Sequence, residues 1–365
     1  MRIVVKVGSN VLRAGTDRIH RPRLIDLARQ LARLSSEGHE LVLVSSGAIF
    51  AGRELLGADL AKHRKDIPYK QMLAAVGQGR LMALYQQIFE MYNLTVAQAL
   101  LTRADLANRT RYLNARNTIQ RLLQHKVIPI INENDVVAVD EIKIGDNDNL
   151  SGLVANLIDA NLLIILTDQA GLFTSDPRTN DDAQLIREVP LIDDAIRAIA
   201  GGSSGEIGTG GMRTKIEAAE LATRSGTEVV IAPGNEPDSI LGVVRGELLG
   251  TRFPTQLSRL ESRKRWLLAE AAQGAIKIDE GAVRALLKSG KSLLVVGVVE
   301  VTGDFRRGAI IRVLSQPGQE IGRGIANYKA QDLSAICGKR SDQIADILGY
   351  EYGPTAIHRD NLVIL

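Results

Sequence analysis

The sequence predicts an α/β protein, with a doubly wound, mostly parallel sheet covered by helices and followed by a smaller β-rich domain. Three observations support this fold class. The first 250 residues alternate short, continuously apolar runs with helix-like patterns, as the βα units of a parallel sheet do. Small and polar residues follow every apolar run. After residue 250 the pattern changes to a polar stretch and then to short β-like segments separated by glycines.

Four apolar runs are predicted strands, at residues 3–5, 41–44, 127–131 and 162–166. Helical patterns follow at 48–55, 69–92, 150–160 and 216–224, and in 69–92 the large apolar residues recur at spacings near three and four. Ligands of open α/β sheets bind at the carboxyl ends of the strands. The polar residues after these runs are therefore candidate site residues, although each cluster alone also suits an ordinary turn.

The chain changes character near residue 254. Residues 254–275 are polar and read as a linker, and beyond them come a short helical pattern at 281–287 and β-like segments at 293–301 and 309–314. We expect a first domain at 1–255, a linker at 256–275 and a second domain at 276–365. The second domain should be a small α+β domain of barrel type.

Composition excludes several classes of protein. With 45% hydrophobic and 24% charged residues, the 365-residue chain can bury a core and is long enough for two domains. Its one cysteine excludes an intrachain disulfide, and none of its five histidines has metal-ligand spacing. The apolar run at the N-terminus stops at Lys6, and no stretch has the ~20 apolar residues of a membrane helix. We expect a cytoplasmic protein without a metal site of its own.

The segment Ile207-Gly-Thr-Gly-Gly-Met-Arg-Thr-Lys215 leads into a helical pattern. Glycines allow successive N–H groups to point at an anion, the helix N-terminus adds its dipole, and Lys215 adds a full charge. The Gly-Lys-Ser/Thr order of a Walker A loop is absent. The segment therefore indicates a phosphate site, while a flexible hairpin remains the alternative.

Lys6 ends the first predicted strand and is followed by Gly8. A lysine there is poorly placed for a solvated surface charge, although its stem could extend along the sheet edge to solvent. A buried ammonium group needs an anionic partner. A protein carboxylate or a bound phosphate would serve.

The sequence holds two amide–carboxylate clusters, Gly145-Asp-Asn-Asp-Asn149 before the predicted helix 150–160 and Asn132-Glu-Asn-Asp135 after the predicted strand 127–131. Asp148 or Asn149 could simply cap the following helix, but a cap explains only one of the four polar residues. Ser45-Ser-Gly47 begins another predicted helix, where hydroxyl and N–H groups suit a carboxylate or serve only as a cap. Together with the lysines, these clusters indicate a site for a phosphorylated nucleotide and a zwitterionic amino acid.

These segments resemble motifs of the glutamate 5-kinases, which belong to the amino acid kinase family and start proline synthesis from glutamate. The resemblance rests on Lys6-Val-Gly-Ser9, Ser45-Ser-Gly-Ala48, Asn132-Glu-Asn-Asp135, Gly145-Asp-Asn-Asp-Asn149, Thr167-Asp-Gln-Ala-Gly-Leu172 with Ser175-Asp-Pro-Arg178, and Gly208-Thr-Gly-Gly211 with Lys215. The C-terminal part is similar to a PUA domain, in Gly290-Lys-Ser-Leu-Leu294, Val301-Thr-Gly-Asp-Phe-Arg-Arg-Gly308, Gly322-Arg-Gly-Ile-Ala-Asn-Tyr328 and Ile347-Leu-Gly-Tyr350. The fold implied is the three-layer amino acid kinase fold with a PUA-like β-barrel.

The resemblance also implies the site residues. Lys6 and Lys215 would contact the ATP phosphates and the transferred group, and Asp148 would hold the two lysines. Glutamate would be bound by Ser46, Gly47, Asp135 and Asn147. ATP would be bound by Lys6, Gly8, Ser9, Thr167, Asp168, Thr209, Gly210, Gly211, Met212 and Lys215. The role of Arg213 stays open.

The chemistry agrees with this assignment. A γ-carboxylate with a pKa of about 4.3 is already an ionised nucleophile at neutral pH, so no general base is required. Catalysis then rests on positioning and on cations, with Mg²⁺ held mainly by the ATP phosphates and water. The resemblance further implies inhibition by proline, for which 136–144 is the candidate segment, and a dimer or tetramer.

Two other functions stay open from the sequence. A different acceptor (aspartate, acetylglutamate, carbamate or UMP) would use the same fold. RNA binding by the PUA-like domain is compatible with the 17 Lys and Arg against 12 Asp and Glu of residues 251–365, a net charge of +5. Aromatic residues, however, are only 4% of the chain, which argues against a surface that stacks many bases.

Overall fold

The computed structural model describes residues 1–57, 66–138, 147–201, 211–255, 267–268 and 271–365. The chain divides into two compact units, one of residues 1–106 and 115–258 and the other of residues 107–114 and 259–365. None of the described helices combines the length and the apolar composition that crossing a bilayer requires.

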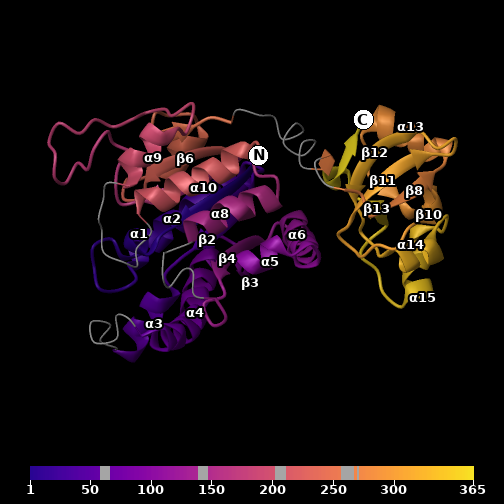
Figure 1. The fold of residues 1–365 in the computed structure, drawn as a ribbon. Helices are drawn as coiled ribbons and strands as arrows, with labels where there is room; N and C mark the ends of the chain where they lie inside the picture. The colour runs from indigo at the N-terminus through magenta and orange to yellow at the C-terminus, as the bar shows by residue number, and fades with distance from the viewer. Residues whose placement is uncertain (58–65, 139–146, 202–210, 256–266, 269–270) are drawn as a thin grey trace. The chain divides into compact units, whose positions relative to one another are not determined.

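Seven strands among the described residues of the first unit form one sheet, in the order β3-β4-β2-β1-β5-β6-β7 (Figure 1). All neighbours pair in parallel except β7, which is antiparallel to β6. The strands are β1 (Arg2–Val7), β2 (Glu40–Ser45), β3 (Val96–Leu101), β4 (Ile128–Glu133), β5 (Leu162–Thr167), β6 (Glu228–Pro233) and β7 (Thr251–Phe253). The mostly parallel sheet that the alternating pattern predicts is therefore present.

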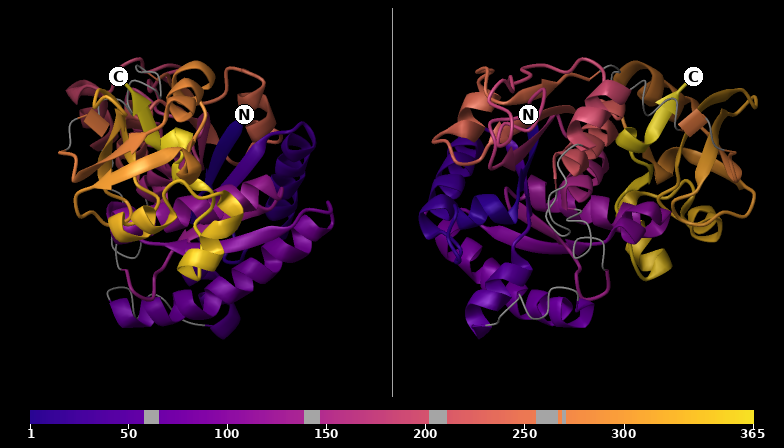
Figure 2. Two further views of the ribbon diagram at one scale, coloured as in Figure 1. Left: turned by 90° about the vertical axis from the view of Figure 1, so that its right-hand side faces the viewer. Right: turned by 60° about the vertical axis from the view of Figure 1, so that its left-hand side comes forward.

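Helices cover both faces of this sheet (Figure 2). They are α1 (Ser9–Arg13), α2 (Arg21–Ser36), α3 (Ala48–Leu56), α4 (Ile67–Glu90), α5 (Arg103–Ala107), α6 (Arg109–Gln124), α8 (Asn147–Leu157), α9 (Asp194–Gly201), α10 (Met212–Arg224) and α11 (Ser239–Val244). Side chains of α2, α4 and α11 form one apolar cluster with alternate residues of β1, such as Ile3 and Val5. α8 contacts β1 and β5, and α10 contacts β6 and α8.

A buried arginine fixes the end of α8. Arg116 of α6 donates from Nη1 to the backbone oxygen of Leu157 at 2.8 Å, and its Nη2 lies 2.5 Å from Oδ2 of Asp159. A helix leaves its last carbonyl groups without partners, and a cation there also suits the helix dipole. α8 is therefore held at the end opposite to Asn147 and Asp148.

The second unit is rich in strands. A five-stranded sheet has the order β10-β8-β11-β12-β14, and β13 pairs with β9. The elements are β8 (Gly274–Ile278), α13 (Glu280–Ser289), β9 (Leu293–Leu294), η1 (Val295–Gly297), β10 (Val298–Thr302), β11 (Ile310–Ser315), β12 (Glu320–Ile325), α14 (Ala330–Ile336), η2 (Ser341–Gln343), α15 (Ile344–Leu348), β13 (Thr355–Ile357), η3 (Arg359–Asn361) and β14 (Leu362–Ile364).

One strand expected from the sequence is split in two. The apolar run 293–301 predicts a single strand, but a 3₁₀ turn at Val295–Gly297 separates β9 from β10. The backbone N–H of Asp279 donates to the oxygen of Gly297 at 3.0 Å, and a Cβ at Gly297 would lie 2.7 Å from the Cβ of Ala282. Close packing against α13 bends the chain, so that β9 and β10 join different sheets.

Residues 107–114 belong to the second unit. The sequence analysis placed them in the first domain. Leu113 is buried in one apolar cluster with Ile310, Ile325 and Val363. Nη1 of Arg307 donates to the side-chain oxygen of Asn114, and Nε of Arg307 donates to the backbone oxygen of Asn327 at 3.0 Å. This short segment therefore completes the core of the β-rich unit.

Candidate active site

Four strands bring their polar carboxyl ends to one edge of the sheet. β4, β2, β1 and β5 are consecutive neighbours, and they are the four strands that the apolar runs predict. Lys6 pairs with Val44 of β2 and Ile165 of β5, while Val44 pairs with Ile131 of β4. The chain leaves β1 for β2 on one side, and after β4 it crosses to β5 on the other. This is the topological switch point at which open α/β sheets bind ligands.

Two lysines and one aspartate meet at this edge. Asp148 lies in the first turn of α8 and is completely buried. Nζ of Lys6 lies 2.5 Å from Oδ1 of Asp148, and Nζ of Lys215, in the first turn of α10, lies 3.2 Å from Oδ2. The lysine side chains are only 5% and 8% exposed. Each carboxylate oxygen therefore holds one ammonium group, and Lys6 is not a solvated charge at the sheet edge.

Neighbouring hydroxyl groups fix Asp148 further. Thr214 donates from Oγ1 to Oδ2 of Asp148 at 2.7 Å, and Ser151 donates to the backbone oxygen of Asp148 at 2.5 Å. α8 begins at Asn147, so Asp148 lies inside the helix rather than capping it. Sequence reasoning missed Thr214, although its place immediately before Lys215 on the same helical turn was a usable signal.

Opposite electrostatic effects act on this cluster. Burial alone would raise the pKa of Asp148, but the charges of Lys215 and Lys6, with the hydrogen bond from Thr214, hold that pKa well below its usual range. Burial lowers the pKa of Lys215, as does the nearby charge of Lys6, while Asp148 opposes both effects. The aspartate thus stays ionised and favours the charged form of a buried ammonium group.

A chain of side-chain amides lies beside the lysines. Nδ2 of Asn147 donates to Oγ of Ser46 at 2.9 Å and to Oδ1 of Asn132 at 2.9 Å. All three residues are buried. Gly47, which precedes α3, has φ = 110°, a conformation that side chains with a Cβ rarely adopt. The structure therefore brings Ser46, Gly47 and Asn147 together from β2 and α8.

Asp135 and Ser45 both contact residues of α4. Asp135 follows β4 and is 5% exposed, and its backbone oxygen accepts from Nε2 of Gln71 at 2.9 Å. The Ser45 hydroxyl lies 2.8 Å from the hydroxyl of Tyr85 in the core, where burial raises the pKa of the tyrosine. Ser45 therefore faces the α4 side of the sheet, and only Ser46 of the serine pair joins the amides.

A cavity of about 440 Å³ adjoins Lys215. Its walls come from α1, from the chain that follows β5, from α9 and from the start of α10, with Asn10, Thr167, Asp168, Gly211 and Met212 among the lining residues. Nδ2 of Asn10 donates to Oδ2 of Asp168 at 3.2 Å. Gly8 and Ser9 begin α1 next to this wall. Thr209 and Gly210 lie outside the described residues, as does most of 136–144.

The loop that follows β5, at residues 173–185, forms one wall of the cavity and is held by its own hydrogen bonds. Phe173 and Leu185 form an antiparallel bridge at its base. Arg178 pairs with Asp176 through two hydrogen bonds, Nε to Oδ1 at 3.0 Å and Nη2 to Oδ2 at 2.8 Å. These contacts lower the pKa of Asp176 to about 2. A guanidinium group is therefore held in a defined orientation on the wall.

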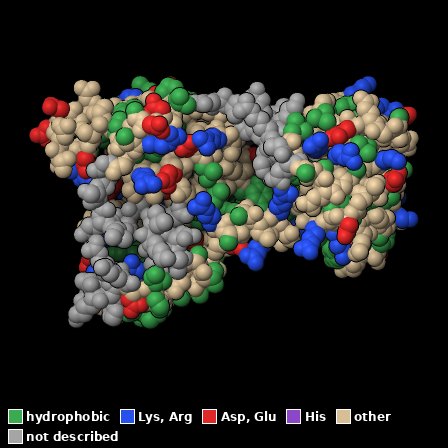
Figure 3. Space-filling view, viewed as in Figure 1, with side chains coloured by type: hydrophobic (Ala, Val, Ile, Leu, Met, Phe, Trp, Pro, Cys, Tyr) green, Lys and Arg blue, Asp and Glu red, His purple; other side chains and the backbone are tan. Residues whose placement is uncertain are grey.

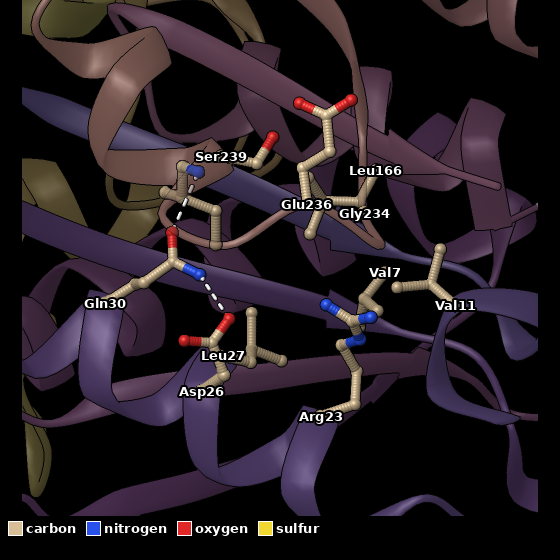
Figure 4. A pocket seen from close by; sticks show the side chains of 11 residues that line it. Val7, Val11, Arg23, Asp26, Leu27, Gln30, Leu166, Gly234, Glu236 and Ser239 are labelled. Atoms are coloured by element: carbon tan, nitrogen blue, oxygen red, sulfur yellow. Dashed lines mark hydrogen bonds between the residues drawn. The ribbon is translucent and has the colours of Figure 1, made fainter. Parts of the chain in front are cut away.

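A second cavity lies on the opposite face of the sheet, between α2 and the chain after β6 (Figure 4). Gln30 bridges there between Asp26 and the backbone of Ile240. Its volume is only about 10 Å³, the space of a single water molecule. The 440 Å³ cavity is thus the one of the two that has room for a nucleotide.

Comparisons with known proteins identify the family of the chain. The amino acid kinase family profile matches residues 1–233, and the PUA domain profile matches residues 274–348. A glutamate 5-kinase of Herpetosiphon aurantiacus is 56% identical over 364 residues, covering 100% of this chain and 98% of its own. A glutamate 5-kinase of Deinococcus radiodurans is 55% identical and covers 100% of both chains. The chain belongs to the amino acid kinase family, among the glutamate 5-kinases.

Two questions left by the sequence are the role of Arg213 and the presence of a metal site. Arg213 forms an exposed ion pair with Glu217 on α10 at 2.9 Å, and its side chain is 76% exposed. Among the described residues, no group of three or more His, Cys, Asp or Glu side chains is placed to hold a metal ion. Mg²⁺ carried by a nucleotide would take its ligands chiefly from phosphate oxygens and water, so it would not require such a group.

Proposed function

We propose that this protein transfers the γ-phosphoryl group of ATP to the γ-carboxylate of L-glutamate, giving L-glutamyl 5-phosphate in the first step of proline biosynthesis. One observation carries the proposal. Two buried ammonium groups share Asp148 between a nucleotide-sized cavity and a cluster of amide and hydroxyl groups. The full-length similarity to glutamate 5-kinases supports the same acceptor.

Glutamate occupies the amide side of the lysines in this proposal. Its α-ammonium group is a cation and needs acceptors, which the carboxylate of Asp135 and the side-chain oxygen of Asn147 supply. Its carboxylates need donors, which Ser46 and the backbone at Gly47 supply at the start of α3. These groups come from the ends of two neighbouring strands, β2 and β4, and from the start of α8, so the pocket depends on the order of strands in the sheet.

ATP occupies the 440 Å³ cavity. Its phosphates lie towards Lys6 and Lys215, against the chain at Gly8 and Ser9 and against the Gly-rich segment with Thr209, Gly210, Gly211 and Met212. Thr167 and Asp168 contact the remainder of the nucleotide. Arg178 on the loop after β5 adds a cation that is already oriented by Asp176. Mg²⁺ bound to the nucleotide would neutralise part of the phosphate charge.

The residues of this chain act by position and charge. An oxygen of the ionised γ-carboxylate forms a bond to the γ-phosphorus, the bond to the β,γ-bridging oxygen breaks, and ADP leaves. No proton is transferred, since the nucleophile is already deprotonated. The barrier is the approach of two anions, which Lys6 and Lys215 lower by neutralising charge on the transferred group. Asp148 holds both amines beside the transferred group and favours the charged form of Lys215.

Two further properties belong to the proposal. Proline, which shares the α-carboxylate of glutamate, competes at the glutamate pocket through the segment 136–144, of which Val136 and Val137 are described and exposed. The protein assembles into a dimer or tetramer. Rates that do not respond to millimolar proline would contradict the inhibition. A monomer in analytical ultracentrifugation would contradict the assembly.

A substrate screen tests the main proposal. Purified protein with ATP and Mg²⁺ is supplied in turn with glutamate, aspartate, acetylglutamate, carbamate and UMP, and ADP release is measured. Hydroxylamine traps an acyl phosphate as a hydroxamate, which separates carboxyl phosphorylation from ATP hydrolysis. Glutamate hydroxamate is the expected product, and activity with acetylglutamate but not with glutamate would refute the acceptor.

The RNA alternative has less support from the second unit. The guanidinium carbon of Arg307 lies 3.7 Å from the ring centre of Tyr352, which also contacts Tyr328 and Tyr350. These aromatic rings contact one another rather than forming separate stacking platforms. On the face shown in Figure 3, basic side chains are interspersed with acidic ones. We therefore propose that the PUA domain is a structural or regulatory appendage.

A further inference from the structure

The helix α4 supplies a glutamine to the amide chain beside the lysines. Nδ2 of Asn132 donates to Oε1 of Gln78 at 2.9 Å. Oδ1 of Asn132 in turn accepts from Nδ2 of Asn147 at 2.9 Å and from the backbone N–H of Glu133 at 2.9 Å. A continuous path of hydrogen bonds therefore runs from Gln78 through Asn132 and Asn147 to Ser46.

Two neighbours favour the observed orientation of the Asn132 amide, the backbone N–H of Glu133 and the side-chain oxygen of Gln78. An asparagine side chain has an oxygen that only accepts and a nitrogen that only donates. If the amide of Asn132 were reversed, its nitrogen would face the N–H groups of both Asn147 and Glu133, and its oxygen would face the oxygen of Gln78. The backbone N–H of Glu133 thus sets the orientation in which Asn132 can receive the Asn147 amide, and the acceptor on Gln78 holds the Asn132 side chain there.

Close helix packing makes α4 a firm base for this contact. A Cβ at Gly77 would lie 1.9 Å from the backbone oxygen of Ala48, and a Cβ at Gly52 would lie 2.0 Å from that of Leu73. Only glycine permits α3 and α4 to approach so closely. Gln78 therefore follows a residue that is locked against the start of α3, where Gly47 belongs to the same pocket.

The same helix holds a second part of the pocket. Gln71 lies seven residues before Gln78, on the same face of α4. Its Nε2 donates to the backbone oxygens of Asp135 at 2.9 Å and Val136 at 3.1 Å. α4 thus contacts the end of β4 through the side chain of Asn132, and the chain after β4 through the backbone of Asp135 and Val136.

We propose that Gln78 is a positioning residue of the amino-acid pocket. By accepting from Asn132 it holds Asn147 towards Ser46, and its loss loosens the glutamate pocket while leaving the nucleotide cavity intact. This inference rests on the proposed function, because it assumes that Ser46 and Asn147 bind the amino acid. It adds a residue on α4 that does not itself touch the substrate.

The test is a Gln78→Met variant, which keeps the length and helix propensity of the side chain but has no acceptor. Gln86→Met on the exposed face of α4 is the matched control. For Gln78→Met we expect the KM for glutamate to rise about five- to tenfold, the effect of one lost hydrogen bond, with the KM for ATP within about twofold. The control leaves both unchanged. Gln78→Ala gives the same comparison if the methionine variant does not fold.

An unchanged KM for glutamate, or equal increases for glutamate and ATP, overturns the inference. A double variant identifies the path of the effect. In an Asn147→Ala background, Gln78→Met should change the KM for glutamate by less than about twofold, because the residue through which it acts is gone. A full additional increase contradicts action through Asn147. If Asn147→Ala alone leaves the KM for glutamate unaltered, the pocket assignment itself is wrong.

Discussion

Replacing Asp148 by asparagine removes the charge that both buried amines share. At an effective dielectric constant of about 20, the contacts at 2.5 and 3.2 Å correspond to gross attractions of about 7 and 5 kcal/mol. Desolvation offsets much of this, and removing one partner of a buried ion pair typically costs about 3–5 kcal/mol. We expect Asp148→Asn to lower the free energy of unfolding by about 3–5 kcal/mol. We also expect kcat to fall by a factor on the order of 10²–10³.

Urea unfolding and ADP release measure the two effects separately. Asp194→Asn is the control, because that carboxylate is paired with Arg197 at the surface and is fully exposed. It should change neither quantity. An Asp148→Asn protein that unfolds at the same urea concentration as the unmodified protein, with the same kcat, would refute the role of the shared aspartate.

The pH dependence of this variant has a defined sign. The pKa of Asp148 is depressed in the folded state, so its stabilisation is present above the unfolded value of about 3.9 and declines as the pH falls below that value. Asp148→Asn should lack this acid-dependent loss. Because Asp148 opposes the lowered pKa of Lys215, the variant's kcat should also decline at a lower alkaline pH. An alkaline limit that does not move would contradict this coupling.

Three other changes test separate parts of the molecule. Lys6→Ala or Lys215→Ala should lower kcat on the order of 10²–10³-fold in the ADP-release assay; a folded variant with unaltered kcat contradicts their role. Asp135→Ala should raise the KM for glutamate and leave that for ATP unchanged, and the reverse pattern would move Asp135 to the nucleotide. Arg116→Ala leaves Asp159 and the end of α8 without their buried cation, so urea unfolding should show a loss of about 3–5 kcal/mol; a loss below 1 kcal/mol would show that α8 is held in another way.

Four of the strands that are buried on both faces could be predicted from the sequence, whereas β6 was missed although it is equally apolar and buried. β1, β2, β4 and β5 are continuously apolar and end in polar clusters, so both their existence and the shared ligand edge could be predicted. β3 was missed because its Ala, Gln and Leu residues suit a helix equally well and its side chains are mostly half-buried at the sheet edge. β7 has only three residues, too few to show a period.

Some residues of the site could likewise be predicted from the sequence, and others could not. Lys6 and Lys215 could be singled out from the sequence because each lies at an anion-binding turn and a buried charge demands a partner. The assignment of Asp148 as that partner came from the resemblance to the glutamate 5-kinases. Gln78 could not be singled out, since a glutamine within a 24-residue helix gives no local sign of the asparagine it meets. The segment 107–114 was also hidden, because helical periodicity says nothing about which unit buries the apolar face.

The position of Lys6 within β1 ties the protein's chemistry to the parity of a single strand. Val5 and Val7 belong to the apolar cluster on the α2 side, whereas Lys6 reaches Asp148 of α8 on the other side. A shift of β1 by one residue against its neighbours would send the ammonium group into that cluster and two valines towards the aspartate. The register of this short strand therefore decides both the packing of the core and the presence of a charge at the site.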